Sequence, residues 1–115
     1  MTHLSSYPWH ICGVGAIGSL WASALIERGV PVTLLLKDTV QLEQYTGAGG
    51  INVWDQQCNT HTQPVAYIPS NPAPSNSNLT KINHLLVCCK AQDTLAAILP
   101  WRKIIADDAI IILLQ

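Results

Sequence analysis

The sequence predicts an α/β fold built on a doubly wound, mainly parallel sheet. Short, continuous apolar runs alternate with segments of helical periodicity. Apolar residues make up 49% of the 115 residues, and charged residues only 11%. That balance is expected when strands are buried on both faces, or when a domain lacks part of its cover. Three glycines also separate the first apolar run from the first amphipathic segment.

The first half of the chain predicts a strand, a helix and a second strand. Residues 9–12 (WHIC) form a short apolar strand, and a glycine turn follows directly. A helix over 16–28 is expected because apolar residues recur at helical spacing and form one buried stripe. These residues are Ile17, Leu20, Trp21, Ala24 and Leu25. Arg28 and Gly29 suit the end of that helix, and residues 32–36 (VTLLL) predict a fully buried strand.

The second half is more varied. Residues 47–50 (GAGG) predict a turn, and 51–54 and 63–68 are expected to pair as antiparallel strands. Residues 69–78 are rich in Pro, Ser and Asn and predict a surface loop. A buried strand over 84–89 precedes a short helix over 93–99, with Asp93 as its N-cap and Pro100 interrupting it. Residues 109–114 (AIIILL) predict the last strand of one domain spanning 1–115.

Composition excludes several classes of function. The net charge is −1, which does not favour a nucleic-acid or membrane surface. No apolar stretch approaches the roughly 18 residues of a membrane span, and no signal peptide is visible at the N-terminus. The four cysteines form no C-x-x-C pair and are expected to be free thiols in a reducing cytoplasm. The four histidines have no metal-ligand spacing, so no metal site is expected.

The glycine-rich turn has a mechanical interpretation. In a G-x-G-x-x-G turn between strand and helix, Gly13 allows the tight turn and Gly18 lets the helix pack closely on the strand. Gly15 has no side chain, so a pyrophosphate can approach the backbone at the positive end of the helix dipole. This pattern predicts dinucleotide binding. The alternative is an ordinary tight turn between a strand and a helix.

Residues after the later strands bear on which dinucleotide binds. An NAD site usually has an acid at the end of the second strand, whereas this strand ends in Leu36, Lys37 and Asp38. If Leu36 holds that place, Lys37 points at the ribose and suits the 2′-phosphate of NADP. If the register differs by one or two residues, Asp38 is the NAD acid. Lys90 follows the 84–89 strand, where its charge points toward a bound cofactor or anionic substrate.

At these residues the chain resembles ketopantoate reductase (2-dehydropantoate 2-reductase). The similarity lies in GVGAIGSLWA, in the basic residue after the second strand, in LLVCCKAQDT and in AIIILLQ. It spans nearly all of 9–115 and is weakest over 45–80. The resemblance implies a Rossmann-like doubly wound α/β fold, truncated before the family's C-terminal helical domain. It also implies NADPH-dependent reduction of 2-dehydropantoate to pantoate, a step toward coenzyme A, by hydride transfer to the keto carbon.

The family pattern assigns roles to some residues and leaves others outside the chain. Lys37 would meet the 2′-phosphate of NADP where the family usually has arginine, and Lys90 matches a lysine on the nicotinamide side of the cleft. No catalytic residue is expected within this chain, apart from an electrostatic role for Lys90, because the family's catalytic lysine belongs to the absent domain. The residues implied to hold the pyrophosphate are Gly13, Val14, Gly15, Ala16, Ile17 and Gly18.

Two other hypotheses about the function of this sequence remain open. The same motif would serve a non-catalytic NAD(P)-sensing regulatory domain, because a fold does not fix a function. The chain could also be an inert remnant with an incomplete sheet, whose apolar faces drive association. The expected partners are a small 2-oxoacid substrate and a second copy of the chain in a homodimer.

Overall fold

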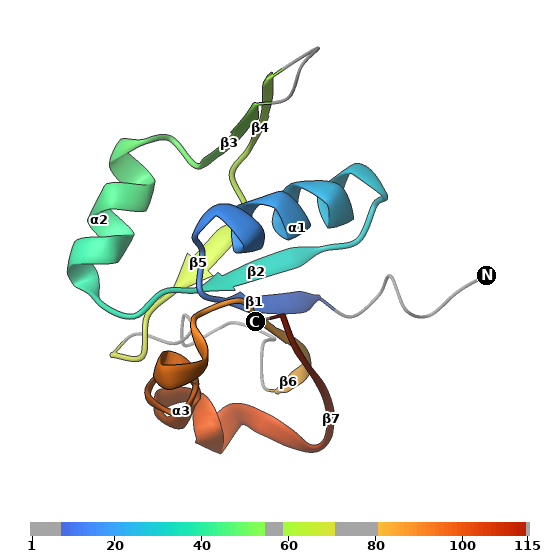
Figure 1. Ribbon diagram of the computed structural model, residues 1–115, viewed down its shortest axis with the longest axis vertical. Coiled ribbons are helices and arrows are strands. Elements are labelled where there is room, and N and C mark those ends of the chain that lie inside the picture. The colour runs from blue at the N-terminus through green and yellow to red at the C-terminus, as the bar shows by residue number, and fades with distance from the viewer. Residues whose placement is uncertain (1–7, 55–58, 71–80, 115) are drawn as a thin grey trace.

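The computed structural model describes residues 8–54, 59–70 and 81–114, and its centre is a five-stranded parallel sheet. The strands are β1 (Trp9–Cys12), β2 (Val32–Leu35), β5 (Val65–Tyr67), β6 (Ile82–Val87) and β7 (Ile105–Leu113), and their order is β5-β2-β1-β6-β7 (Figure 1). All neighbouring pairs are parallel. The predicted α/β class and parallel sheet are confirmed. The last two strands begin before the predicted 84–89 and 109–114.

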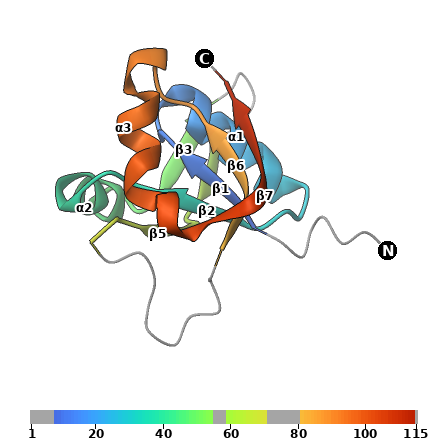
Figure 2. The ribbon, with the colours of Figure 1, turned by 90° about the horizontal axis from the view of Figure 1, so that it is seen from below.

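Helices cover the sheet from both sides. Helix α1 (Ala16–Glu27) lies on one face, and α3 (Thr94–Ile98) lies on the other (Figures 1 and 2). Short 3₁₀ turns, η2 (Ala91–Asp93) and η3 (Leu99–Ile104), flank α3 in place of one helix over 93–99. Asp93 holds the N-cap position of α3 but makes no side-chain capping bond. Pro100 is the second residue of η3, as expected of a helix interruption.

The apolar runs are explained by two hydrophobic cores, one on each face. Neighbouring residues of a strand point to opposite faces, so a strand buried on both sides is mainly apolar along its whole length. All five side chains of residues 32–36, which comprise β2 and Leu36, are buried. The core on the α1 face includes Ile11, Leu34 and Leu86, and the core on the α3 face includes Cys12, Leu35 and Val87.

The predicted buried stripe of α1 is wrong for three of its five residues. Ile17, Leu20 and Trp21 are 51%, 55% and 43% exposed. The buried positions are instead the small residues Gly18, Ala22 and Ser23, and Leu25 and Ile26 pack partly against the core. Because Gly18 brings the helix close to the sheet, only small side chains fit directly between the two. The helix ends as predicted, with Arg28 as C-cap and Gly29 at φ +78°.

The predicted pairing of 51–54 with 63–68 is also wrong. Strand β3 (Ile51–Trp54) pairs antiparallel with β4 (Asn59–Thr62), and β5 joins the main sheet parallel to β2. β4 has the sequence NTHT, which carries no apolar signal for a strand. The hairpin packs against α1 through Ile51 and Val53, which join the core on that face.

Helix α2 (Thr39–Gly47) was not predicted. Three residues separate it from β2. None of its residues is buried, and its sequence accordingly lacks the apolar stripe that predicts a helix. Gly49 and Gly50, at φ +74° and +112°, then form the expected turn into β3. No described helix is long and apolar enough to cross a membrane. The predicted loop over 69–78 lies outside the described residues from 71 onward, as does Cys58.

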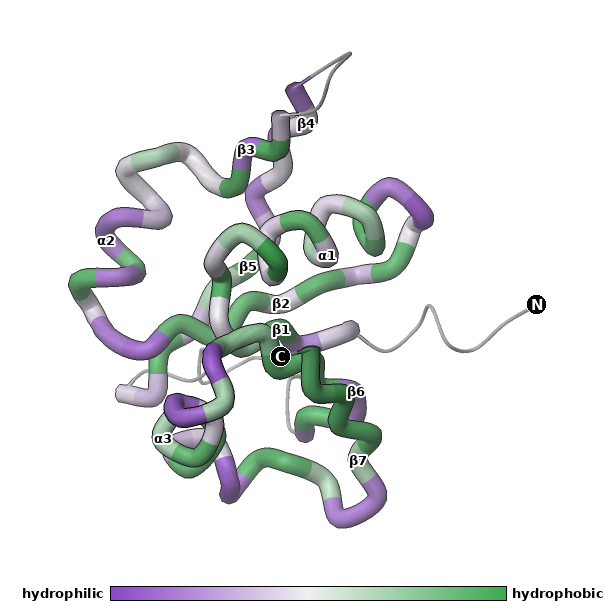
Figure 3. The backbone as a smooth tube through the Cα atoms, viewed as in Figure 1, coloured by the Kyte–Doolittle hydropathy of each residue, from purple (hydrophilic) through white to green (hydrophobic). Residues whose placement is uncertain are grey.

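Strand β7 is the last strand of the described sheet, and its apolar end is poorly covered on both faces. Ile110, Ile111, Ile112 and Leu113 are 54%, 43%, 38% and 54% exposed. In Figure 3 the hydrophobic colour runs along the later parts of β6 and β7, after hydrophilic residues earlier in each strand. The expectation of a sheet that lacks part of its cover is therefore confirmed at this strand.

Candidate dinucleotide-binding site

The residues singled out in the sequence gather at the carboxyl ends of three neighbouring strands. Gly13 follows β1, Lys37 follows β2 after one residue, and Lys90 lies shortly after β6. β1 lies between β2 and β6 in the sheet. After β1 the chain adds β2 and then β5 on one side of β1, and it adds β6 and then β7 on the other side. Such a switch point leaves a crevice at the carboxyl edge, where ligands of open α/β sheets bind.

Two glycines of the turn allow close backbone packing. Gly13 has φ +90°, and a Cβ there would lie 2.7 Å from the backbone nitrogen of Cys89. A Cβ at Gly18 would overlap the carbonyl oxygen of Gly13. These contacts bring β1, α1 and the segment after β6 together at one point. The predicted structural roles of Gly13 and Gly18 agree with this geometry.

Gly15 differs from the other two because nothing occupies the space beside it. No heavy atom lies within 4 Å of the position its Cβ would take, and its φ is −96°, which other residues adopt. It is the N-cap of α1, and its carbonyl accepts the first helical bond from Ser19 at 2.9 Å. The first amides of a helix have no partner within the helix. The absent side chain therefore leaves open space at the positive end of the helix dipole.

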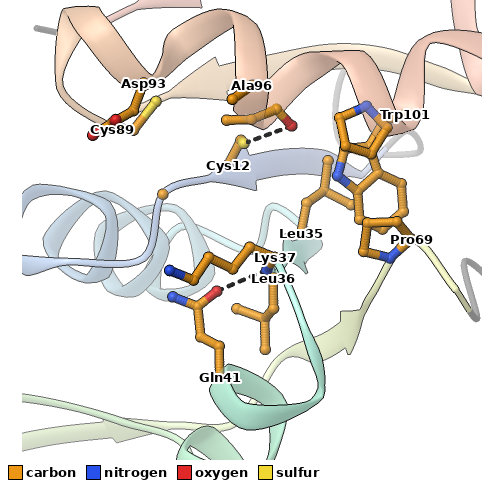
Figure 4. Close-up of a pocket in the computed structure, with 13 residues that line it drawn as sticks. Cys12, Leu35, Leu36, Lys37, Gln41, Pro69, Cys89, Asp93, Ala96 and Trp101 are labelled. Carbon is orange, nitrogen blue, oxygen red and sulfur yellow. Dashed lines mark hydrogen bonds between the residues drawn. The ribbon is translucent and has the colours of Figure 1, made fainter.

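A cavity of about 430 Å³ lies beside the glycine turn, between the end of β2 and α3 (Figure 4). Of the eight predicted site residues, Gly13 and Lys37 line it, and the other six do not. Most of its wall is apolar, with a few polar groups. The lining residues besides these two are Cys12, Leu35, Leu36, Gln41, Pro69, Cys89, Asp93, Ala96, Ala97, Pro100 and Trp101.

Lys37, Asp38 and Gln41 form a capping arrangement at the start of α2. The Asp38 carboxylate accepts a hydrogen bond from the Gln41 backbone N–H at 2.8 Å, and the Gln41 Oε1 accepts one from the Lys37 N–H at 2.8 Å. Asp38 is thus used as a helix cap. The Lys37 side chain is exposed and extends beside the Gln41 amide along the cavity wall (Figure 4).

Lys90 lies at the same edge of the sheet but outside the cavity wall. It is exposed and is the N-cap of η2, and its carbonyl accepts hydrogen bonds from the Asp93 N–H at 2.9 Å and the Thr94 hydroxyl at 3.4 Å. These bonds fix the backbone that carries Lys90. The predicted position after β6 is correct, and the distance from Lys90 to a cofactor stays untested.

The described cysteines are free, and two of them line the cavity. Burial, with smaller effects of the Cys89 and Cys88 thiols, raises the pKa of Cys12 to about 12. Burial also raises the pKa of Cys88. Cys12 and Cys88 are therefore uncharged at neutral pH and unsuited to nucleophilic chemistry. Among the described residues, no group of three histidine, cysteine or acidic side chains is placed to hold a metal ion.

Sequence reasoning missed most of the cavity wall. The D-x-x-Q spacing of Asp38 and Gln41 is a capping-box signal that indicates the start of α2 and so places Gln41. Ala96, Ala97 and Trp101 have no comparable signal. They reach the wall because α3 and η3 pack on the face of the sheet that carries Cys12 and Leu35, which no local pattern shows.

Residues 9–115 match the profile of the family described as ketopantoate reductase PanE/ApbA. The chain belongs to this family. It corresponds to the N-terminal NAD(P)-binding domain of ketopantoate reductases, and the resemblance inferred from the sequence is confirmed.

Solved structures agree with the fold. The 2-dehydropantoate 2-reductase structure from Enterococcus faecalis, itself a putative assignment, matches with a TM-score of 0.75 at 19% identity over 94% of this chain. D-mandelate dehydrogenase, solved with NADH and anilino(oxo)acetate, matches with a TM-score of 0.74 at 17% identity over 93%. The 2-dehydropantoate 2-reductase from Methylococcus capsulatus matches with a TM-score of 0.67 at 22% identity over 92%. This chain spans about one third of each, 33%, 32% and 32% respectively.

Proposed function

We propose that this chain binds NADP(H) at the carboxyl edge of its sheet, as the cofactor-binding part of an NADPH-dependent 2-dehydropantoate 2-reductase. The observation that carries the proposal is the open space at Gly15, directly in front of the α1 N-terminus. A side chain at this position would be tolerated by the fold, yet none is present. The vacancy suits a group that must approach the backbone closely and accept its free N–H bonds, as a pyrophosphate does.

The cavity suits the adenosine end of the same dinucleotide. It lies on the β2 side of the glycine turn and shares Gly13 with it. Leu35, Leu36, Ala96 and Ala97 offer apolar contact for a flat ring. Val14, Ala16 and Ile17 complete the turn at the helix start, and their backbone would face the phosphates.

The groups after β2 favour NADP over NAD. An NAD site needs a carboxylate free to accept hydrogen bonds from the ribose hydroxyls. Asp38 is the only described acid directly after β2, and its carboxylate caps α2. Lys37 is exposed on the cavity wall, where an ammonium attracts a 2′-phosphate. This residue replaces the family's usual arginine, so the pairing loses the planar fork of a guanidinium.

In the intact enzyme, a bound nicotinamide cofactor would supply the hydride that reduces a 2-oxoacid. The residues of this chain would hold and orient the dinucleotide. We propose that Lys90 adds positive charge on the β6 side of the cleft, where it would stabilise an anionic substrate or a developing alkoxide. No proton donor for the reaction is proposed within these residues. A cytoplasmic setting is also proposed, supported by the free thiols of Cys12, Cys88 and Cys89.

Lys37 provides the direct test of cofactor choice. We expect the chain to bind NADPH more tightly than NADH in a calorimetric titration. Lys37→Gln should weaken NADPH binding by about 10-fold to 100-fold, the value of one charge-assisted hydrogen bond, and leave NADH binding unchanged. Lys81→Gln is the matched control, because Lys81 is exposed and immediately precedes β6, at the opposite edge of the sheet. Equal affinities of the unmodified chain for the two cofactors would remove the argument for NADP.

A further inference from the structure

Gln41 lines the cavity together with Lys37 but has no role in the function proposed above. It belongs to the first turn of α2, whereas Lys37 lies before the helix. The side-chain oxygen of Gln41, Oε1, accepts a hydrogen bond from the Lys37 backbone N–H at 2.8 Å. The amide group of Gln41 is therefore held against the backbone of the residue that we expect to meet the 2′-phosphate of NADP.

The partner of this hydrogen bond fixes the orientation of the amide. A backbone N–H can only donate, so the atom of Gln41 that faces it is the oxygen. The amide nitrogen, Nε2, is consequently turned away from the Lys37 backbone. Among the residues that the structure describes, none accepts a hydrogen bond from Nε2. Gln41 thus has two N–H donors available to a ligand at the cavity wall.

The helix that carries Gln41 is fixed at several points. Leu42 and Tyr45 pack partly against the core on the α1 face, and the Tyr45 hydroxyl donates to the Pro64 carbonyl at 2.5 Å. At the start of the helix, the Asp38 carboxylate accepts a hydrogen bond from the Gln41 N–H at 2.8 Å. Both the backbone and the side chain of Gln41 are thus bonded to the segment before the helix. The amide is therefore oriented before any ligand binds, which lowers the entropic cost of a contact.

Helix capping alone does not account for the position of this side chain. In a capping box, the side chain of the third helical residue bonds to the backbone N–H of the N-cap residue. Asp38 is the N-cap of α2 and Gln41 is the third helical residue, yet the Gln41 amide bonds one residue further back, at Lys37. The amide is thereby placed beside the Lys37 side chain. Figure 4 shows that side chain running past the Gln41 amide, with the terminal nitrogens of both on the same side.

We propose that Gln41 is a specificity-determining residue of the cofactor site, and that its Nε2 donates to the 2′-phosphate together with the Lys37 ammonium. This inference rests on the proposed binding of NADP(H). A phosphate has three strong acceptor oxygens, and a lysine is a point charge that lacks the two-pronged fork of an arginine. The Gln41 amide supplies a second donor at a fixed position. In NADH a hydroxyl replaces the phosphate, so the bond loses the charge that would strengthen it.

Two small ligands isolate the contribution of the 2′-phosphate. Adenosine 2′,5′-bisphosphate and adenosine 5′-monophosphate differ only in that group, so the ratio of their dissociation constants in an NMR titration measures it. Gln41→Met keeps a similar length, adds no charge and removes the donors, so it should lower the preference for the bisphosphate by about 10-fold, the value of one charge-assisted hydrogen bond. Gln44→Met is the matched control, because Gln44 is exposed in the same helix and does not line the cavity.

A second measurement uses the unmodified chain and so does not depend on the folding of Gln41→Met. The side-chain NH2 resonances of Gln41 should shift when the bisphosphate is added and stay in place with the monophosphate. An unmodified chain that binds the two ligands equally, or binds neither, would refute the proposed preference for NADP itself. A chain that prefers the bisphosphate, but keeps this preference in folded Gln41→Met or shows no shift of the Gln41 NH2 resonances, would overturn the role of Gln41 alone.

Discussion

Gly13, Gly15 and Gly18 have three different roles within six residues. Gly13 needs a positive φ and close contact with Cys89, and Gly18 needs contact with the Gly13 carbonyl. Gly15 needs neither, because its Cβ position is open and its φ is ordinary. The first two glycines are thus explained by the fold, whereas the fold does not require Gly15, and we propose that a bound pyrophosphate does. The spacing of the motif predicts all three roles, because each follows from the geometry of a strand-to-helix turn.

His10 is a second residue with a measurable consequence. It is fully buried in β1, and burial lowers its pKa to about 4, an effect that the backbone of His84 partly offsets. The unfolded chain holds this proton below about pH 6.5, and the folded chain holds it only below about pH 4. Between these pH values the unfolded chain gains a proton that the folded chain does not. The free energy of unfolding is therefore unaffected by His10 above about pH 6.5 and decreases as the pH falls from there toward 4.

We expect the free energy of unfolding to fall by about 2 kcal/mol between pH 7 and pH 5 because of His10. Urea denaturation at the two pH values measures this change. His10→Leu should remove that part of the pH dependence, whereas His61→Leu should keep it, because His61 is exposed on β4. A His10→Leu variant with the pH dependence of the unmodified chain would show that His10 does not carry the effect.

At the scale of elements, the apolar periodicity of α1 predicts the wrong buried face of the helix. The stripe of large apolar residues predicts the buried face of a typical amphipathic helix. Gly18 overrides that preference, because it lets the helix axis approach the sheet so closely that the small face packs inward. The β1–α1–β2 unit was otherwise predictable, since each strand is a mainly apolar run and the helix has clear end signals. Strand β4 and helix α2 were not, because their stability comes from hairpin pairing and capping rather than from an apolar pattern.

The close approach of α1 predicts an unusual response to a helix-favouring substitution. Alanine normally stabilises a helix by about 1 kcal/mol relative to glycine. Gly18→Ala should instead destabilise the domain by about 1–3 kcal/mol, because the new methyl group overlaps the Gly13 carbonyl. Gly47→Ala is the control, since no heavy atom lies within 4 Å of its Cβ position in α2. Urea denaturation of both variants decides the matter, and a Gly18→Ala domain as stable as the unmodified one would contradict this packing.

At the scale of the whole molecule, the strand order accounts for both surfaces discussed above. Placing β1 between β2 and β6 creates the switch point and the crevice at the carboxyl edge. Placing β7 last leaves its apolar end without a neighbouring strand among the described residues. The parallel sheet was predictable from the apolar runs. The wall of the cavity was not, because Leu35 and Gln41 come from a segment far in sequence from Trp101, and only the folded chain brings the two segments together.

The most direct test of the central claim is a calorimetric titration of NADPH into Gly15→Val, beside Gly47→Val. Neither glycine has a positive φ or a heavy atom within 4 Å of its Cβ position, so both variants should fold. Gly47→Val should bind NADPH as the unmodified chain does. Gly15→Val should bind at least about tenfold more weakly, because its side chain fills the space kept for the pyrophosphate. A folded Gly15→Val chain with unchanged NADPH affinity would contradict the account.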